Sequence, residues 1–393
     1  MTERFDTIVI GLGALGSATA WDLARRGKSV LGLERFELGH SHGASHDTSR
    51  ILRHSYHTPS YVRLTQQAYV DWARLEQDSG EKLVTTVGGL DLFPQDPAID
   101  PVDYTESLDE VGIRYDLLDA RAVAERWPQF SLPEGTLVLH QEDAAIVPAG
   151  RGTRVMQERA RAHGADLRDQ VRVTSLRDLG DGVEVTFSSA TEDCTVVGSS
   201  VVVTADAWAN DVLGSLGLEI PLEVTLEQVT YFAPERPADF ADLPLWIWMD
   251  DPSFYGFPCY GEQTVKAAQD CGGPIVDAEA RLGDARGGDT DEGMQQLLAD
   301  HMGRILPGSG RPVRSLRCQY TLTPDRDFVI SPVPGHERVV VGLGAAHGFK
   351  FAPTFGRLLG DLADAGETGF DLSPYRLDRP GLTDPDYAAH WLV

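Results

Sequence analysis

Three glycines near the N-terminus have the spacing Gly-x-Gly-x-x-Gly, which suits the binding of a dinucleotide. They are Gly11, Gly13 and Gly16. In such a loop the first glycine makes a tight turn, the second lets a pyrophosphate approach the backbone, and the third lets helix and strand pack closely. Glu34 ends the next β-rich run, where an acid would hydrogen-bond to ribose hydroxyls. The pattern predicts NAD or FAD binding without choosing between them, and the acid argues against NADP.

A row of basic residues is the second group that could do chemistry. His46, Arg50 and Arg53 have the spacing i, i+4, i+7, which would place them on one face of a helix. That face is either an anion- or flavin-facing site or a solvated surface paired with Asp47 and other acids. More histidines crowd the segment, namely His42, His54 and His57. No nearby carboxylate completes a familiar metal signature, so no metal site is predicted.

Charge and composition exclude several classes of partner. Lys and Arg total 34 against 60 Asp and Glu, a formal net charge of −26 over 393 residues, which disfavours nucleic acid and anionic membrane as partners. Four scattered cysteines make neither a disulfide scaffold nor a zinc site. The apolar N-terminal run follows acidic residues rather than basic ones, and no apolar stretch is long enough to span a bilayer. We expect a cytoplasmic protein.

The elements that must position these residues differ between the ends and the middle of the chain. The α/β-type runs at the ends are Phe5–Ile10, Ala14–Arg26, Ser29–Glu34, Arg338–Leu343 and Pro353–Asp364. Further helices are expected at Tyr61–Gln77, Pro148–Ala162 and Asp291–Ile305. Strand-like runs fill 171–205 and 225–268, with a turn at Asp181-Gly182. This order indicates about two domains that are interleaved along the chain.

Four separated motifs carry a resemblance to a known family. They are GASHDTSRILRHSY, FYGFP followed by Lys266, RCQYTLTPDRDFVIS around Cys318, and GLGAAHGFKFAP. Together with the glycine loop they resemble the monomeric sarcosine oxidase and N-methyltryptophan oxidase family, within the wider amino-acid oxidase group of FAD enzymes. The resemblance implies a mixed α/β fold: a Rossmann-like FAD-binding domain (1–86, 147–219 and 319–393) interleaved with an antiparallel-sheet substrate domain (87–146 and 220–318).

The resemblance also implies roles for single residues. Cys318 matches the cysteine that attaches FAD through a thioether; a buried, inert cysteine is the alternative. His46 and Arg50 match basic residues beside the flavin ring. Lys266 matches the lysine that promotes reaction of reduced flavin with oxygen, as a cation stabilising developing superoxide. The pair that holds the substrate carboxylate corresponds to Arg53 and Lys350.

Other site residues follow from the same alignment of motifs. Tyr255 and Tyr320 match pocket tyrosines that position the amine or simply pack. The expected cofactor contacts also include Arg35, Ser45, Lys350, Gly344, His347 and Gly348, the last three in a turn whose N–H groups could support negative charge on the flavin.

Two positions depart from the family pattern. Asp270 replaces a histidine near the substrate, and this acid could favour a cationic substituent. Asp206 stands in a turn that is usually small-Gly-Ala-Trp near the flavin nucleotide, where it can tolerate a left-handed conformation. Trp246 and Trp248 fall where pocket residues are expected, with core packing as the alternative for at least one of them.

The predicted function is a flavin-dependent oxidase of a secondary amine, an N-methyl or cyclic α-amino acid. Hydride passes to FAD, and O2 takes the electrons as hydrogen peroxide, leaving an imine that hydrolyses. The alternatives are a flavin dehydrogenase with another electron acceptor, an oxidase of a biosynthetic amine, and a catalytically silent nucleotide-binding scaffold. The resemblance suggests a monomer.

Overall fold

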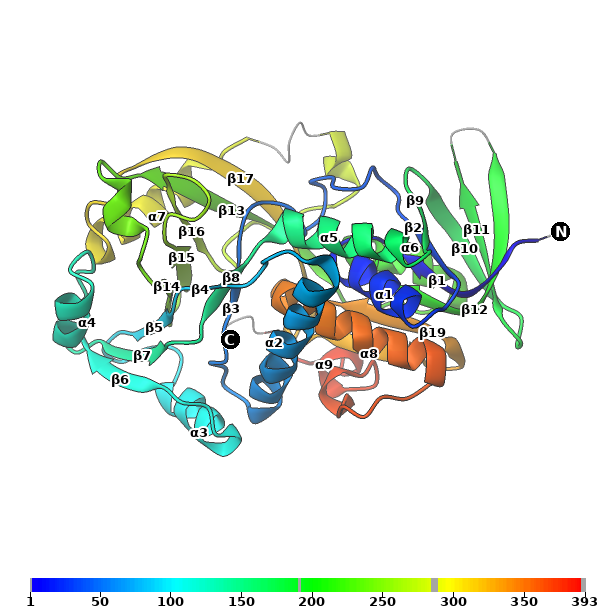
Figure 1. Ribbon diagram of the computed structural model, residues 1–393, viewed down its shortest axis with the longest axis horizontal. Helices are drawn as coiled ribbons and strands as arrows, with labels where there is room; N and C mark the ends of the chain where they lie inside the picture. The colour runs from blue at the N-terminus through cyan, green and yellow to red at the C-terminus, as the bar shows by residue number, and fades with distance from the viewer. Residues whose placement is uncertain (1, 190–191, 284–288, 390–393) are drawn as a thin grey trace.

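Two large sheets dominate the computed structural model, which describes residues 2–189, 192–283 and 289–389 (Figure 1). The predicted domain ranges also include residues outside this described part. The first sheet has the parallel order β9-β2-β1-β12-β19, with β18 antiparallel beside β19, and a β10–β11 hairpin paired to the first half of β12. Its strands are β1 (Arg4–Ile10), β2 (Val30–Leu33), β9 (Asp166–Arg168), β10 (Arg172–Asp178), β11 (Val183–Ser188), β12 (Asp193–Val203), β18 (Val329–Val333) and β19 (His336–Leu343).

Three helices pack together beside the first sheet: α1 (Ala14–Arg25), α5 (Ala149–Ala162) and α8 (Ala352–Ala365) (Figure 1). Helix α1 begins directly after Gly13, and small residues keep it close to its neighbours. A Cβ added to Gly356 would lie 2.4 Å from the backbone carbon of Ala18, so α1 and α8 cross at backbone contact. This tight packing fixes the start of α1, where the glycine loop lies.

The second sheet is largely antiparallel, in the order β17-β13-β16-β15-β14-β5-β7-β6. Its strands are β5 (Gly89–Phe93), β6 (Asp116–Asp119), β7 (Leu137–Gln141), β13 (Glu223–Ala233), β14 (Leu245–Trp248), β15 (Phe254–Phe257), β16 (Val265–Gln269) and β17 (Arg311–Leu322). Helix α7 (Glu292–Ile305) packs on β13, β16 and β17. The other helices are α2 (Pro59–Ser79), α3 (Pro101–Val111), α4 (Ala120–Arg126), α6 (Ala209–Leu213) and α9 (Pro380–Thr383).

A small sheet of β3 (Arg50–Leu52), β8 (Ala145–Val147) and β4 (Thr85–Thr86) lies between the two large ones (Figure 1). The mixed α/β fold and the expected positions of the main helices and strands are confirmed. The segment that carries His46, Arg50 and Arg53 is not a helix, so these residues do not share a helical face. Asp47 has a φ of 77°, which no right-handed helix accommodates, and the chain continues as β3.

Within the residues that the structure describes, no helix is both long and apolar enough to cross a lipid bilayer.

Candidate active site

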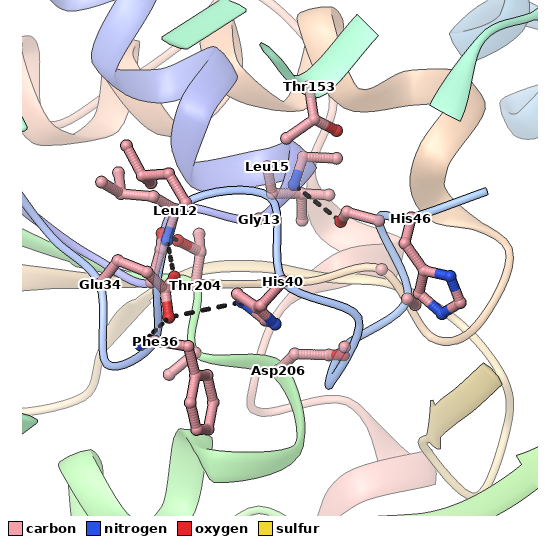
Figure 2. Close-up of a pocket in the computed structure, with 18 of the residues that line it drawn as sticks. Leu12, Gly13, Leu15, Glu34, Phe36, His40, His46, Thr153, Thr204 and Asp206 are labelled. Carbon is pink, nitrogen blue, oxygen red and sulfur yellow. Dashed lines mark hydrogen bonds and ion pairs between the residues drawn. The ribbon is translucent and has the colours of Figure 1, made fainter. Parts of the chain in front are cut away.

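A cavity of about 840 Å³ extends from the glycine loop to the small sheet, and its walls come from segments far apart in the chain (Figure 2). Figure 2 shows Glu34, Phe36 and His40 at one end of this cavity and His46 at the other. The predicted cofactor or site residues that line it are Gly11, Gly13, Glu34, Arg35, Ser45, His46, Arg50, Tyr320, Gly344 and Gly348.

The glycine loop fits a dinucleotide by its packing. A Cβ on Gly11 would lie 2.6 Å from the Thr204 carbonyl oxygen, and a Cβ on Gly16 would lie 1.8 Å from the Gly11 carbonyl oxygen. Gly11 also has a φ of 87°. Only glycine fits these two positions, as the fingerprint requires. Gly16 therefore acts through helix packing and does not line the cavity.

Glu34 is a buried carboxylate at the end of β2. Its Oε2 accepts a hydrogen bond from the Leu12 amide at 2.8 Å, and its Oε1 accepts one from the Phe36 amide at 3.0 Å. Burial raises the pKa of Glu34, but contacts with His40 and these two amides outweigh it and lower the pKa overall. An ionised acid beside the glycine loop can accept from ribose hydroxyls through its remaining lone pairs.

The rings of Phe36 and Trp208 and the Arg35 guanidinium form a wall at this end of the cavity. The Arg35 guanidinium lies 5.7 Å from the Trp208 ring centre and pairs with both Glu279 oxygens, at 2.8 and 2.7 Å. Trp208 Nε1 donates to the same carboxylate at 3.2 Å. Glu279 lies in the connection that follows β16 of the second sheet. Its contacts with Arg35 and Trp208 therefore link this connection to the first sheet.

At the opposite end, Arg50 holds the loop before β3 in place. Its guanidinium donates to the carbonyl oxygens of Ser49, Ala44 and His46 at 2.8, 2.8 and 3.1 Å. Ser45 Oγ accepts from the Ala14 amide at 2.9 Å, which joins this loop to the start of α1. The cavity's two walls therefore meet at the glycine loop.

His46 differs from the expectation of a second positive charge. Burial, and then the Arg50 cation, lower the pKa of His46 to about 4, so the ring is neutral at physiological pH. Its Nε2 is buried and has no hydrogen-bond partner among the described residues. Arg50 carries the positive charge here, and His46 offers an unpaired ring nitrogen to whatever occupies the cavity.

Four predicted residues share one face of the second sheet. Tyr231 is paired with Lys266, Tyr255 with Ala268, Glu227 with Cys318, and Thr225 with Tyr320. Directly paired residues of antiparallel strands project to the same face, and residues two apart do so too. Cys318, Tyr320, Lys266 and Tyr255 therefore lie together. The hydroxyls of Tyr255 and Tyr320 are 3.4 Å apart.

Lys266 is a buried amine with a fixed set of partners. Its Nζ lies 2.6 Å from Asp47 Oδ2 and donates to the Ser49 carbonyl at 3.0 Å and to Ser49 Oγ at 3.2 Å. Tyr231 donates its hydroxyl proton to the other oxygen of Asp47. Burial lowers the pKa of Lys266 to about 8 despite Asp47, whose own pKa the neighbouring cations lower to about 2. Both members are therefore charged at pH values well between about 2 and 8.

Cys318 is 6% exposed and lies on β17 two residues before the cavity-lining Tyr320. Burial raises the pKa of its thiol to about 11, although the Arg50 and Lys266 cations act to lower it. The thiol is therefore protonated at neutral pH, and the nearby Arg50 and Lys266 cations favour its anion.

Arg53 and Lys350 meet around Tyr56. The Arg53 guanidinium lies 5.3 Å from the Tyr56 ring centre and pairs with the buried Asp91, while Lys350 Nζ contacts the Tyr56 hydroxyl at 2.6 Å. Burial, and then the Arg53 and Arg326 cations, hold the pKa of Lys350 well below its usual value. A carboxylate placed between the two side chains would relieve this repulsion and restore the lysine's charge.

His347 lies in the turn between β19 and α8. Its Nε2 lies 3.0 Å from the Arg326 carbonyl oxygen, and because that oxygen only accepts, Nε2 carries the proton. Burial lowers the pKa of His347 well below its usual value, so the ring is neutral. Gly344 and Gly348, at either side of this turn, line the cavity.

Asp270 is already paired with a cation. Arg326 Nη2 donates to its two oxygens at 2.9 and 2.7 Å, so a guanidinium of the chain itself already pairs with the acid that was expected to attract a cationic substituent. Asp206 has a φ of 49° and lines the cavity, with a pKa that burial raises to about 6. The left-handed turn expected at Asp206 is confirmed.

Trp246 does not lie in the site. It is paired with Gly256, one residue from the Ile247–Tyr255 pair, so it faces the side of the sheet opposite Tyr255. There it packs at 1% exposure in the core beneath α7, stacked near His301. Its predicted contact with substrate is contradicted, because strand alternation puts it on the wrong face.

Two ion pairs of the site were not predicted: Arg53 with Asp91, and Arg326 with Asp270. Asp47, expected as an acid on a solvated surface, is buried beside Lys266 in a left-handed conformation. Asp91 lies outside the motifs, but it is a charged residue inside the apolar run Gly-Leu-Asp-Leu-Phe, which is a signal for a buried partner. Among the described residues, no cluster of His, Cys, Asp and Glu could hold a metal ion.

Comparisons with known proteins match nearly the whole chain. Residues 6–362 match the protein family described as FAD dependent oxidoreductase. The monomeric sarcosine oxidase of Streptomyces avermitilis is 32% identical over 98% of both chains, and the N-methyl-L-tryptophan oxidase of Escherichia coli O81 is 26% identical over 96% of this chain and 99% of that protein. The solved structure of NikD, "an unusual amino acid oxidase essential for nikkomycin biosynthesis", has a TM-score of 0.83 at 28% identity and covers 95% of this chain and 98% of its own. These matches confirm the resemblance inferred from the motifs.

Proposed function

Because the chain belongs to the family of FAD-dependent oxidoreductases and is a flavin-dependent amine oxidase, we propose that its substrate is a secondary α-amino acid, either N-methylated or cyclic. FAD, when bound, would accept two electrons from the amine, which becomes an imine that hydrolyses. It would then pass these electrons to dioxygen, which forms hydrogen peroxide. The observation that carries the proposal is a group of cations around β3 in a chain of net charge −26. Arg50 lines the cavity, Lys266 donates to the adjacent Ser49, and Arg53 and Lys350 both contact Tyr56.

Residues of the first sheet would hold the cofactor. We assign 1–86, 147–219 and 319–393 to the FAD-binding domain and 87–146 and 220–318 to the substrate domain. The glycine loop and Glu34 would bind the nucleotide half, Arg50 would face the ring, and Cys318 would attach it covalently. The name of the Streptomyces avermitilis relative supports a monomer.

Arg53 and Lys350 would bind the substrate carboxylate. The ion pair with Asp91 orients the Arg53 guanidinium, and the hydrogen bond to the Tyr56 hydroxyl orients Lys350 Nζ. Both cations are therefore oriented before a ligand arrives. Such preorganisation lowers the cost of holding the amine in a reactive geometry. Tyr255 and Tyr320 would close the other side. We assign no acid–base residue.

The test is peroxide release by the purified enzyme with N-methyl and cyclic amino acids. We expect turnover with substrates that carry a carboxylate, and an Arg53→Gln variant with a KM raised about tenfold or more, since it loses a charge-assisted contact. The corresponding amides, which lack the carboxylate charge, are the control and should respond little to this variant. Flavin reduction without oxygen uptake would identify a dehydrogenase instead, and no flavin reduction by any amine would reject the proposal.

The oxygen reaction should depend on pH through Lys266. A lysine is charged below its pKa, and that pKa is lowered to about 8, so the cation is present below pH 8 and lost above it. We therefore expect the rate at which reduced enzyme reacts with oxygen to fall as pH rises from 7 to 9. Mixing anaerobically reduced enzyme with oxygen in a stopped-flow instrument measures this rate, and a profile that stays flat to pH 10 would contradict the assignment.

A further inference from the structure

Asp270 continues the face of the second sheet that carries Lys266 and Tyr255. It directly follows β16, and its amide donates to the Ser253 carbonyl at 2.9 Å, which extends the ladder between β15 and β16. Lys266, Ala268 and Asp270 alternate along the chain, so they project to the same side. Asp270 is thus at the edge of the proposed substrate site and not on the outer surface of the sheet.

Its partner Arg326 is connected to the proposed carboxylate site by a chain of hydrogen bonds. The Arg326 carbonyl accepts from His347, the His347 carbonyl accepts from Lys350 Nζ at 3.2 Å, and the same Nζ contacts Tyr56. The side chain of Arg326 is 3% exposed and that of Asp270 is 20% exposed. The acid beside this buried guanidinium offsets part of the cost of removing its charge from water.

The charges around the site are therefore largely cancelled in pairs. Arg53 is paired with Asp91 and Arg326 with Asp270. Lys350, by contrast, contacts two neutral oxygens, those of Tyr56 and His347. This arrangement provides one cation for one carboxylate and presents a neutral ion pair to the rest of the ligand.

We propose that the Asp270–Arg326 pair is a specificity-determining element that makes the site accept an amino acid with an uncharged side chain and reject one with a side-chain carboxylate. Arg326 is in place to bind a second carboxylate, and Asp270 prevents it by occupying the guanidinium. Removing the charge of Asp270 would convert the site into one for dicarboxylates. The inference rests on the proposed function, since it concerns the same substrate site.

Two ligands that differ by one charge test this directly. In 2-methoxysuccinate and its 4-amide, an ether oxygen replaces the amine, so neither can be oxidised, and the two differ only in the side-chain carboxylate. Their Kd values are measured from the change in the flavin absorption spectrum of the full-length holoenzyme. We expect the unaltered protein to bind the amide at least tenfold more tightly, and Asp270→Asn to shift the ratio at least tenfold toward the dicarboxylate.

Further variants separate this role from damage to the fold. Asp270→Asn/Arg326→Gln removes both charges and should lose the dicarboxylate binding that the single variant gains. Arg326→Gln leaves Asp270 unpaired and should reject the dicarboxylate more strongly than the unaltered protein does. Asp325→Asn is the matched control, because it breaks a similar buried pair with Arg379 one residue away and should leave the ratio unchanged.

An unchanged ratio in Asp270→Asn, or an equal shift in Asp325→Asn, would overturn the inference. If Asp270→Asn does not fold, a ratio in Arg326→Gln equal to that of the unaltered protein would overturn it. Failure of the proposed function gives a different result: methoxyacetate, which has the single carboxylate, would not perturb the flavin spectrum, or its Kd would not respond to Arg53→Gln.

Discussion

Replacing Lys266 with methionine is expected to slow the reaction of reduced enzyme with oxygen on the order of 100- to 1000-fold, the range found when one preorganised electrostatic contact is removed from a site. Methionine has a similar length and fills the buried space, so the main change is the loss of one positive charge next to the Ser49 and Asp47 contacts. Reduction of the flavin by substrate under anaerobic conditions should change by only a few-fold, because Arg53 and Lys350 are untouched. Stopped-flow measurement of the two half-reactions gives both rates.

The variant leaves Asp47 without its cation, which is costly for a buried acid. Lys266→Met/Asp47→Asn removes this unpaired charge and should show the same oxygen defect. Arg314→Met is the matched cation control: Arg314 lies over the other side of Tyr231, at 3.6 Å from its ring centre, and should not affect the oxygen reaction. Equal slowing of both half-reactions by Lys266→Met would remove the assigned role.

Replacing Cys318 with serine is expected to abolish covalent retention of the flavin completely. Serine keeps the size and the hydrogen-bonding capacity of the side chain, but its hydroxyl does not form a thioether. The unaltered protein should keep its yellow chromophore and flavin fluorescence on a denaturing gel, and its intact mass should include FAD. The serine variant should release all flavin on denaturation.

The other thiols serve as controls for this experiment. Cys271 lies next to Asp270 at the same end of the second sheet, and burial likewise raises its thiol pKa. Cys271→Ser should therefore leave the attached flavin in place. A colourless precipitate and free FAD from the unaltered protein would reject attachment at Cys318, and retention of flavin by Cys318→Ser would place the bond at another residue.

The nucleotide end of the site was predictable because its signals are local. The glycine loop, the helix after it and Glu34 are close in sequence, and their geometry follows from glycine's conformational freedom and from the strand–turn–helix order. The basic residues His46, Arg50 and Arg53 do not lie on one helical face, for a reason that their spacing does not reveal. A left-handed Asp47, which contacts Lys266 and Tyr231, leads the chain into β3, although the i, i+4, i+7 spacing would suit a helix.

Pairing over long distances explains the other differences. Which face Trp246 occupies depends on its register with Gly256, and a shift of one residue would reverse it. Asp270 is neutralised by Arg326, 56 residues away in sequence. His46 is neutral because it is buried beside Arg50. Charge states of this kind depend on the packed structure, so residue types alone predicted the participants and not their protonation.

The central position of β12 has a consequence for the synthesis of the chain. This strand lies between β1, which ends at Ile10, and β19, which ends at Leu343. At 5–20 residues per second, the ribosome takes roughly 15 to 70 s to make the intervening segment. During that time the N-terminal strand and its glycine loop lack part of their sheet, and the turn with Gly344 and Gly348 is missing from the cavity. The cofactor site is therefore completed only after this turn has been synthesised, and we expect flavin capture to follow that point.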